Sequence, residues 1–175
     1  VAMTIGFFPA FIAHSLNTAL IPNVSNAFVN YDQSRLVRLL RQVIVLTMLY
    51  GVPVCFLFYY FARPLTGMFV ESSLASYYLQ LMWPYFLLHY FTIPLQAFLI
   101  GLGMVKDAFI HNIWATLVTF AIMYLFGSSS SFQMDGVILG LNTGALVLML
   151  LHYFVVCRKI GISLTLSKKV PMFYE

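Results

Sequence analysis

The sequence predicts an all-α integral membrane protein with five transmembrane helices. Of its 175 residues, 62% are apolar and only 8% are charged, and the mean hydropathy is +0.92. A soluble domain carries roughly 25% charged residues, so this chain has too few to cover a surface in contact with water. The apolar residues also form uncharged runs of about the 20 residues that a membrane helix needs. These observations exclude a soluble enzyme, a nucleic-acid-binding domain and a disordered chain.

Short polar connections divide the chain into the five expected helices. The first apolar run ends at the polar segment 30–33, and the segment 63–73 separates the second run from the third. Lys106 and Asp107 precede the fourth run, and the segment 127–135 precedes the fifth. We therefore predict one transmembrane lobe over residues 1–160, a cytoplasmic tail over 161–175, and helices over residues 3–28, 36–62, 74–103, 108–126 and 136–157.

The segment DQSRLVRLLRQV, residues 32–43, has the pattern of an amphipathic helix. Asp32 or Ser34 can cap its first turn, because a short side-chain oxygen accepts a bond from a free backbone N–H there. Its leucines recur at helical spacing and its three arginines lie away from them. We expect this segment to lie at the cytoplasmic membrane interface, near anionic headgroups, before the chain enters the second helix.

The basic residues predict the orientation. Eight of the nine fall on alternate connections, and the exception is Arg63. Cytoplasmic connections carry an excess of Lys and Arg, so this side is predicted to be cytoplasmic, with the N-terminus outside and the C-terminus inside. The eight residues are Arg35, Arg38, Arg41, Lys106, Arg158, Lys159, Lys168 and Lys169.

Three sets of residues inside the apolar runs are candidates for a special role. Polar side chains are costly in lipid, so stripes of them at helical spacing must face either another helix, as hydrogen-bonded packing contacts, or a hydrated path. The substrate-path candidates are His14, Asn17, Thr18, Ser25, Tyr85, His89, Thr92 and Gln96. Prolines kink helices, and the expected kinks are at Pro9, Pro22, Pro53, Pro84 and Pro94. Glycines spaced by four residues let helices approach closely, which predicts tight packing at Gly136, Gly140 and Gly144.

The sequence carries no pattern that indicates an enzyme. A phosphate-binding loop, a nucleophile motif and a pair of carboxylates inside one helix are all missing from it. Cys55 and Cys157 both lie in apolar runs, and the histidines lack the spacing of metal ligands. We therefore predict no catalytic residue, no metal, no cofactor and no disulfide framework.

Several segments together resemble the polysaccharide flippases of the stage V sporulation protein B type. The first run, FFPAFIAHSLNTALIPNVSNAFVNYD, contains a Pro-x-x-Ser step at Pro22–Ser25 that resembles a step in this family. RPLTGMF is similar to the family's outward turn, LQAFLIGLGMVKDAFIHN to its Gly-x-Gly crossing, and DGVILGLNTGALV to its glycine-rich twelfth span. Asn26 stands where the family commonly has an acidic residue.

This resemblance implies a member of the multidrug, oligosaccharidyl-lipid and polysaccharide exporter superfamily, with two six-helix lobes. The five spans would be the eighth to twelfth, most of the second lobe. Because the chain begins at Val1 in an apolar run without a signal peptide, we also expect it to be the later part of a longer protein.

The implied function is the movement of a lipid-linked sugar, with an undecaprenyl-pyrophosphate carrier, across the bacterial cytoplasmic membrane. The implied partners are the bilayer, this substrate and the missing N-terminal lobe. The lobe is expected to supply the charges that bind the pyrophosphate, since no basic residue lies deep in these spans. Two other functions stay open: a cation-coupled drug or metabolite exporter, and a membrane scaffold without transport activity.

Overall fold

The protein is all-helical in a computed structural model that describes residues 1–70, 72–129 and 132–161. Every regular element among these residues is an α-helix. The Lys168 and Lys169 of the expected tail and Glu71 lie outside the described residues. The helices are α1 (Ala2–Phe7), α2 (Ala10–Val29), α3 (Gln33–Tyr60), α4 (Ala62–Gly67), α5 (Ser73–Leu81), α6 (Trp83–Gly101), α7 (Val105–Gly127) and α8 (Gln133–Lys159).

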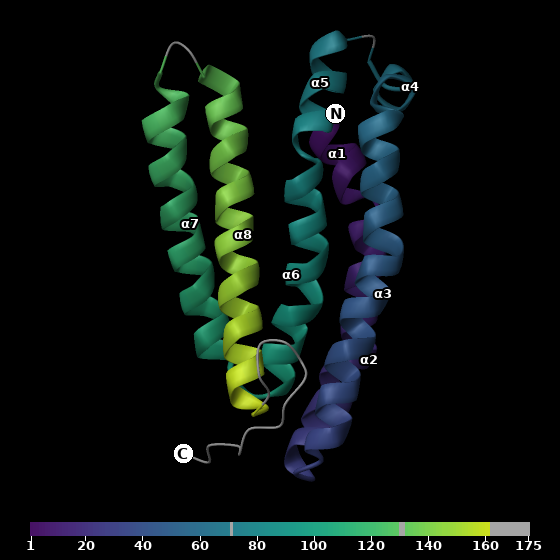
Figure 1. The fold of residues 1–175 in the computed structure, drawn as a ribbon, viewed down its shortest axis with the longest axis vertical. Helices are drawn as coiled ribbons and strands as arrows, with labels where there is room; N and C mark the ends of the chain where they lie inside the picture. The colour runs from purple at the N-terminus through teal and green to yellow at the C-terminus, as the bar shows by residue number, and fades with distance from the viewer. Residues whose placement is uncertain (71, 130–131, 162–175) are drawn as a thin grey trace.

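The long helices run side by side along the length of the molecule (Figure 1). α7 and α8 form an antiparallel hairpin on one side of α6, and α2 and α3 lie on its other side. α6 therefore stands in the middle of the bundle. α1, α4 and α5 are short helices that gather at one end of it.

Four stretches are long and apolar enough to cross a membrane: α1 with α2 as one stretch, then α3, α7 and α8. The third expected helix, 74–103, is not continuous, because the chain breaks at Met82 between α5 and α6. The third crossing would thus consist of α5 and α6 in sequence. The first expected helix is also divided, at Phe8 and Pro9.

The prolines act in two different ways. Pro9 and Pro84 lie where one helix gives way to the next, at positions where a missing backbone N–H leaves no helical bond unmade. Pro22, Pro53 and Pro94 instead lie inside α2, α3 and α6, and each of these helices continues past its proline. Each of these three prolines still removes one hydrogen bond from its helix.

The amphipathic segment is not a separate interfacial helix. Residues 33–43 form the first turns of α3 and continue into the apolar part of that helix without a break. Asp32 caps it, because its carboxylate accepts a 2.9 Å hydrogen bond from the backbone N–H of Arg35. Leu36, Leu40 and Val43 face the core, so the apolar stripe of this segment packs against the bundle, and its position at the membrane interface stays a prediction.

Two clusters of buried apolar side chains hold the bundle together. One lies toward the α2–α3 connection and joins Leu36 and Leu40 of α3 to Phe98 of α6 and Val156 of α8. The other lies toward α1, α4 and α5 and contains Phe58, Leu79, Phe86 and Tyr90. α6 contributes to both clusters, and this explains why it is the helix with the most buried residues.

The α2–α3 connection, the α6–α7 connection and the end of α8 all lie at the same end of the bundle (Figure 1). The described basic residues that were assigned to the cytoplasmic side are on or next to these segments, whereas Arg63 is in α4 at the opposite end. The fold thus places these charges together. That this end faces the cytoplasm remains a prediction from the positive-inside rule.

Cysteine labelling tests this orientation. In a background lacking Cys55 and Cys157, a cysteine at Ser34 and one at Ser129 should react with a membrane-impermeant reagent from opposite sides of the membrane. Ser34 precedes the apolar part of α3, and Ser129 lies between α7 and α8. Reaction of both cysteines from one side would contradict the arrangement of the spans.

Candidate substrate path

A polar face runs along the outside of α2. Ala13, Leu20, Val24 and Ala27 point into the bundle and are buried. The opposite face carries exposed polar side chains, interspersed with the exposed apolar side chains of Phe11, Ile12 and Val29. The polar ones are His14, Ser15, Thr18, Asn23, Ser25 and Asn26. We call these six residues the polar face of α2.

The outward faces of the other long helices are apolar. α3 exposes Leu49, Val52 and Phe56, and α7 exposes Phe109, Leu117 and Phe120. Such faces suit lipid, because apolar side chains lose nothing in hydrocarbon. The polar face of α2 suits lipid less well, because polar side chains are costly there, although Ser15, Thr18 and Asn23 donate bonds to carbonyls of their own helix. The contrast indicates that α2 faces other protein or water.

Asn17 lies at the edge of the polar face and is half-buried. Its side-chain oxygen is enclosed, yet it has no hydrogen-bond partner in the described part of the chain. Most buried polar atoms have a partner, so this oxygen is available to a water or a ligand. His14, Thr18 and Ser25 of the predicted stripe lie beside it on α2 and are exposed.

The predicted stripe on the third crossing, in α6, is only partly on this side. Tyr85 and His89 are half-buried and stack with ring centroids 5.9 Å apart. Phe7, at the end of α1, meets His89 edge-on at 5.0 Å and Tyr85 at 6.1 Å. His14 of the polar face is close enough to His89 to interact electrostatically. These rings therefore join α6 to the polar face near the break between α1 and α2.

Thr92 is the exception among the predicted path residues. It is 4% exposed, and its hydroxyl donates a 2.9 Å bond to the carbonyl of Leu88 in its own helix. It is a packed residue of the α6 core and does not lie on an open path. Gln96, one turn further on, is half-buried.

Arg35 brings a positive charge to the end of the polar face next to the α2–α3 connection. Its guanidinium donates a 3.1 Å bond to the side-chain oxygen of Asn23. Asn26 lies near this end of α2 too, and its side-chain oxygen accepts a 2.6 Å bond from Asn30. Amides and a guanidinium are thus grouped at one end of the polar face. The sequence alone does not reveal this grouping, because in the sequence Arg35 indicates only the orientation of the chain in the membrane.

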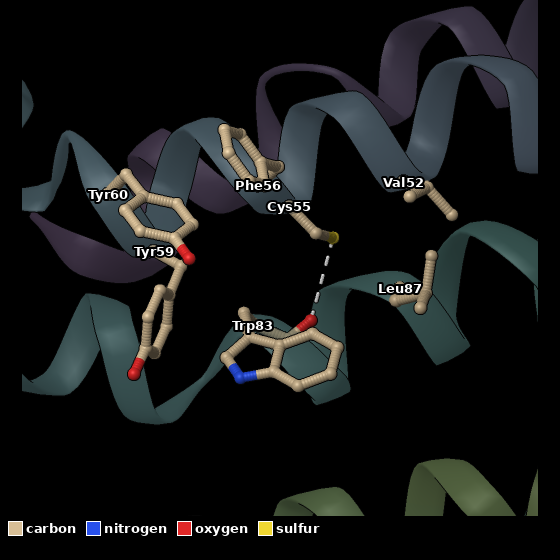
Figure 2. A pocket seen from close by; sticks show the side chains of 7 residues that line it. All are labelled: Val52, Cys55, Phe56, Tyr59, Tyr60, Trp83 and Leu87. Carbon is tan, nitrogen blue, oxygen red and sulfur yellow. Dashed lines mark hydrogen bonds between the residues drawn. The ribbon is translucent and has the colours of Figure 1, made fainter.

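A separate groove lies between α3 and α6 on the side where α3 is apolar (Figure 2). It has a volume of about 360 Å³ and is lined mostly by aromatic and aliphatic side chains. The Cys55 thiol points toward the backbone oxygen of Trp83 at 3.6 Å. The groove carries no charged residue and is not part of the polar face. Its lining residues are Val52, Cys55, Phe56, Tyr59, Tyr60, Trp83 and Leu87.

The three glycines of α8 lie against α7. A Cβ atom at Gly136 would lie 2.5 Å from the backbone of Phe126, and one at Gly140 would lie 2.9 Å from the carbonyl oxygen of Thr119. At Gly144 the added atom would collide with the Thr119 side chain. Glycine at these positions thus permits a close approach of α7 and α8 that a larger residue would prevent.

Two buried histidines were overlooked in the sequence. His111 of α7 and His152 of α8 lie with their ring centroids 5.2 Å apart. The available signal was their place in apolar runs, but they are 41 positions apart and only the α7–α8 pairing brings them together. Both cysteines of the chain, Cys55 and Cys157, are buried free thiols.

Residues 1–125, which include α2 and its polar face, match the MatE family. The chain belongs to this family. It is 48% identical over 167 residues to sporulation protein YkvU of Bacillus subtilis strain 168, which covers 95% of this chain and 38% of that protein. It is 30% identical over 172 residues to stage V sporulation protein B of the same strain, covering 98% of this chain and 33% of that protein.

The MatE chain therefore spans about a third of the length of these curated relatives. No solved structure matches it. The family and the apolar helices identify a multi-pass membrane protein.

Proposed function

We propose that this chain forms most of the second lobe of a flippase that moves a lipid-linked oligosaccharide or polysaccharide precursor across the bacterial cytoplasmic membrane. The observation that carries this proposal is the polar face of α2, which places exposed hydroxyl, amide and imidazole groups along a helix of membrane-spanning length. In a two-lobed transporter this face would turn toward the first lobe and line the central cavity. The names of the two curated relatives, both sporulation proteins, support a role in sporulation.

The chemistry of the polar face suits a sugar headgroup. Hydroxyl and amide groups such as those of Thr18 and Asn17 form hydrogen bonds with sugar hydroxyls without carrying a charge. Tyr85, next to the imidazole of His89, offers an aromatic surface at the same face. Arg35 adds a cation that matches a phosphate group, because a guanidinium binds phosphate oxygens with two parallel bonds.

Transport would follow alternating access, in which two lobes rock around a fixed site. Pro22 lies inside α2 between Thr18 and Ser25. The hydrogen bond that it removes makes this part of the helix easier to bend. α2 is thus suited to change shape as the cavity opens on one side and closes on the other.

A cation-coupled exporter of drugs or metabolites is the second candidate, because the MatE family is shared by both classes. The described acidic side chains, Asp32, Asp107 and Asp135, all lie at helix ends, and none of them lies in the middle of a span. Headgroup flipping and cation-driven drug efflux, both measured with the full-length protein in proteoliposomes, separate the two functions. Absence of both activities would favour a scaffold.

Replacing Asn17 tests the path directly. Asn17→Leu keeps the size of the side chain and removes its hydrogen-bonding groups, so flipping should fall about tenfold, the effect of losing one bond of about 1.4 kcal/mol. The matched control is Thr116→Leu, which makes a similar change at an exposed position of α7. Membrane expression should be unchanged in both. Normal flipping by Asn17→Leu would show that the polar face does not line the path.

A further inference from the structure

The interface between α7 and α8 holds two histidines in an unusual state. His111 is 8% exposed and His152 is not exposed at all, and their rings meet edge to face at 5.2 Å. Nδ1 of His111 and Nε2 of His152 are buried, and neither has a hydrogen-bond partner among the residues that the structure describes. Unpaired buried nitrogens are uncommon in folded proteins, and here two of them lie on neighbouring rings in one interface.

The tautomer of His152 follows from its one hydrogen bond. Its Nδ1 lies 2.8 Å from the carbonyl oxygen of Leu148, one turn earlier in α8. A carbonyl accepts only, so Nδ1 carries the proton and donates it. In the neutral ring the lone pair is then on Nε2, the nitrogen that is enclosed and unpaired. The fold therefore fixes a bare proton acceptor next to the ring of His111.

We propose that His111 and His152 form a proton-binding site that takes up one proton per pair. The proton comes from the aqueous phase and adds to the lone pair on Nε2 of His152, and no other bond of the protein changes. The resulting N–H can donate to Nδ1 of His111, directly after a small ring rotation or through one water. A second proton is excluded because two imidazolium ions at this separation repel each other.

Burial of both rings opposes a positive charge, so the pair needs a compensating anion to hold a proton. Asp107, one turn before His111 in α7, is the acidic residue that acts on this ring in that sense. Lys106 lies next to it in sequence, and Arg158 and Lys159 are at the end of α8, about two turns from His152. Of these three cations, none is close enough to act on either ring.

The neighbouring elements add few titratable groups. α6, which packs on α8, has no Lys, Arg, Asp or Glu. α3 turns Leu36 and Leu40 toward this part of the bundle. On α8 itself, Tyr153 and Cys157 interact with each other. Asp107 is therefore the one described acid positioned to stabilise the protonated pair.

Proton uptake would affect the packing of α7 on α8. The neutral pair leaves two ring nitrogens unpaired. The singly protonated pair, with the His111 proton on Nε2, can satisfy both through one bridge. The site lies about two turns from the helix ends that we predict to be cytoplasmic, so water reaching those ends could supply the proton. This inference does not depend on which substrate the transporter carries.

Histidine C2 hydrogen–deuterium exchange, read by mass spectrometry, tests the site in the full-length transporter. It reports the protonation of each histidine peptide by peptide, over about pH 5 to 8. In the wild-type protein we expect His111 and His152 to titrate together in one coupled step. If both rings stay neutral down to about pH 5, or if each titrates on its own, the site does not exist.

Variants supply the second arm of the test. His152→Gln should move the midpoint of the His111 titration by about one pH unit or more, which is the coupling expected of a shared proton. His111→Gln should move the midpoint of the His152 titration in the same way. Thr116→Val on the lipid-facing side of α7 should leave both midpoints in place. An unchanged His111 in the His152→Gln protein would overturn the proposal. If that protein fails to fold, the coupled wild-type titration still decides.

The outcome is independent of the transport assay. A coupled titration in a protein that flips no lipid-linked sugar would leave the proton site intact and refute only the proposed function. Normal flipping without proton uptake by the pair would support the proposed function and refute the proton site.

Discussion

Gly140→Leu should lower the stability of the α7–α8 hairpin by about 3 kcal/mol, at the upper end of the usual cost of overpacking. Gly140 is buried, and a Cβ there would lie 2.6 Å from the side chain of Met123 and 2.9 Å from the carbonyl oxygen of Thr119. The side chain of Met123 can move, but the carbonyl belongs to the α7 backbone. Leucine would therefore force the two helices apart. The measurement is the thermal or denaturant unfolding of the purified protein in detergent.

Leu150→Phe is the matched control. Leu150 lies on the same helix but is 51% exposed, so a larger apolar side chain there should extend into lipid or detergent at little cost. Gly140→Ala should fall between the two, since its single added methyl group still meets Thr119. Equal stability of the Gly140→Leu and Leu150→Phe proteins would show that α7 and α8 are not tightly packed in the membrane.

The spacing of the α8 glycines predicted a close contact, but it could not name the partner helix. A Gly-x-x-x-Gly pattern describes one surface only. The facing surface on α7 carries Ala115 and Thr119, two small residues four positions apart that lie against Gly140 and Gly144. Thr119 also falls at helical spacing with Asn112 and Thr116, which makes a polar stripe in the sequence. The structure divides that stripe, because Thr116 is exposed while Asn112 bonds to the carbonyl of Ala108 in its own helix.

The local effect of proline predicts only some of the breaks in the helices. Pro9 and Pro22 have the same effect on a helix taken alone, yet the chain breaks at Pro9 and continues through Pro22. The difference is tertiary. The short helix α1 is held on α6 by a 2.6 Å bond from the buried Tyr90 hydroxyl to the carbonyl of Gly6, a contact between residues 84 positions apart.

The polar stripe of α2 could be read from periodicity, because one helix fixes which of its own residues share a face. Whether that face is covered depends on neighbours, and Thr92 shows the limit. It belongs to a similar stripe in sequence, but α6 is surrounded on several sides, and so Thr92 is buried. The His111–His152 pair could not be predicted from the sequence for the same reason, since it forms only through the register of α7 against α8.

Arg35→Gln should reduce flipping of a pyrophosphate-linked substrate by about 10- to 100-fold, the equivalent of the 1.5–3 kcal/mol of a hydrogen bond to a charged group. The guanidinium lies against Asn23 at the end of the polar face, 3.1 Å from its side-chain oxygen. A bond to a neutral amide is readily exchanged for one to phosphate, which is a stronger acceptor. Arg35 would thus provide at least part of the phosphate-binding charge that was assigned to the missing lobe.

The control is Arg41→Gln, which removes the same charge from the same helix. Arg41 is exposed and lies on a different side of α3, so it serves the positive-inside signal without reaching the polar face. If Arg35 acts only through that signal or through general attraction to anionic lipid, the two variants should be equally impaired. If it binds the headgroup, Arg35→Gln alone should lose flipping, and Arg35→Lys should recover part of it, because lysine keeps the charge but not the paired bonds. Equal activity of the Arg35→Gln and Arg41→Gln proteins would remove Arg35 from the substrate path.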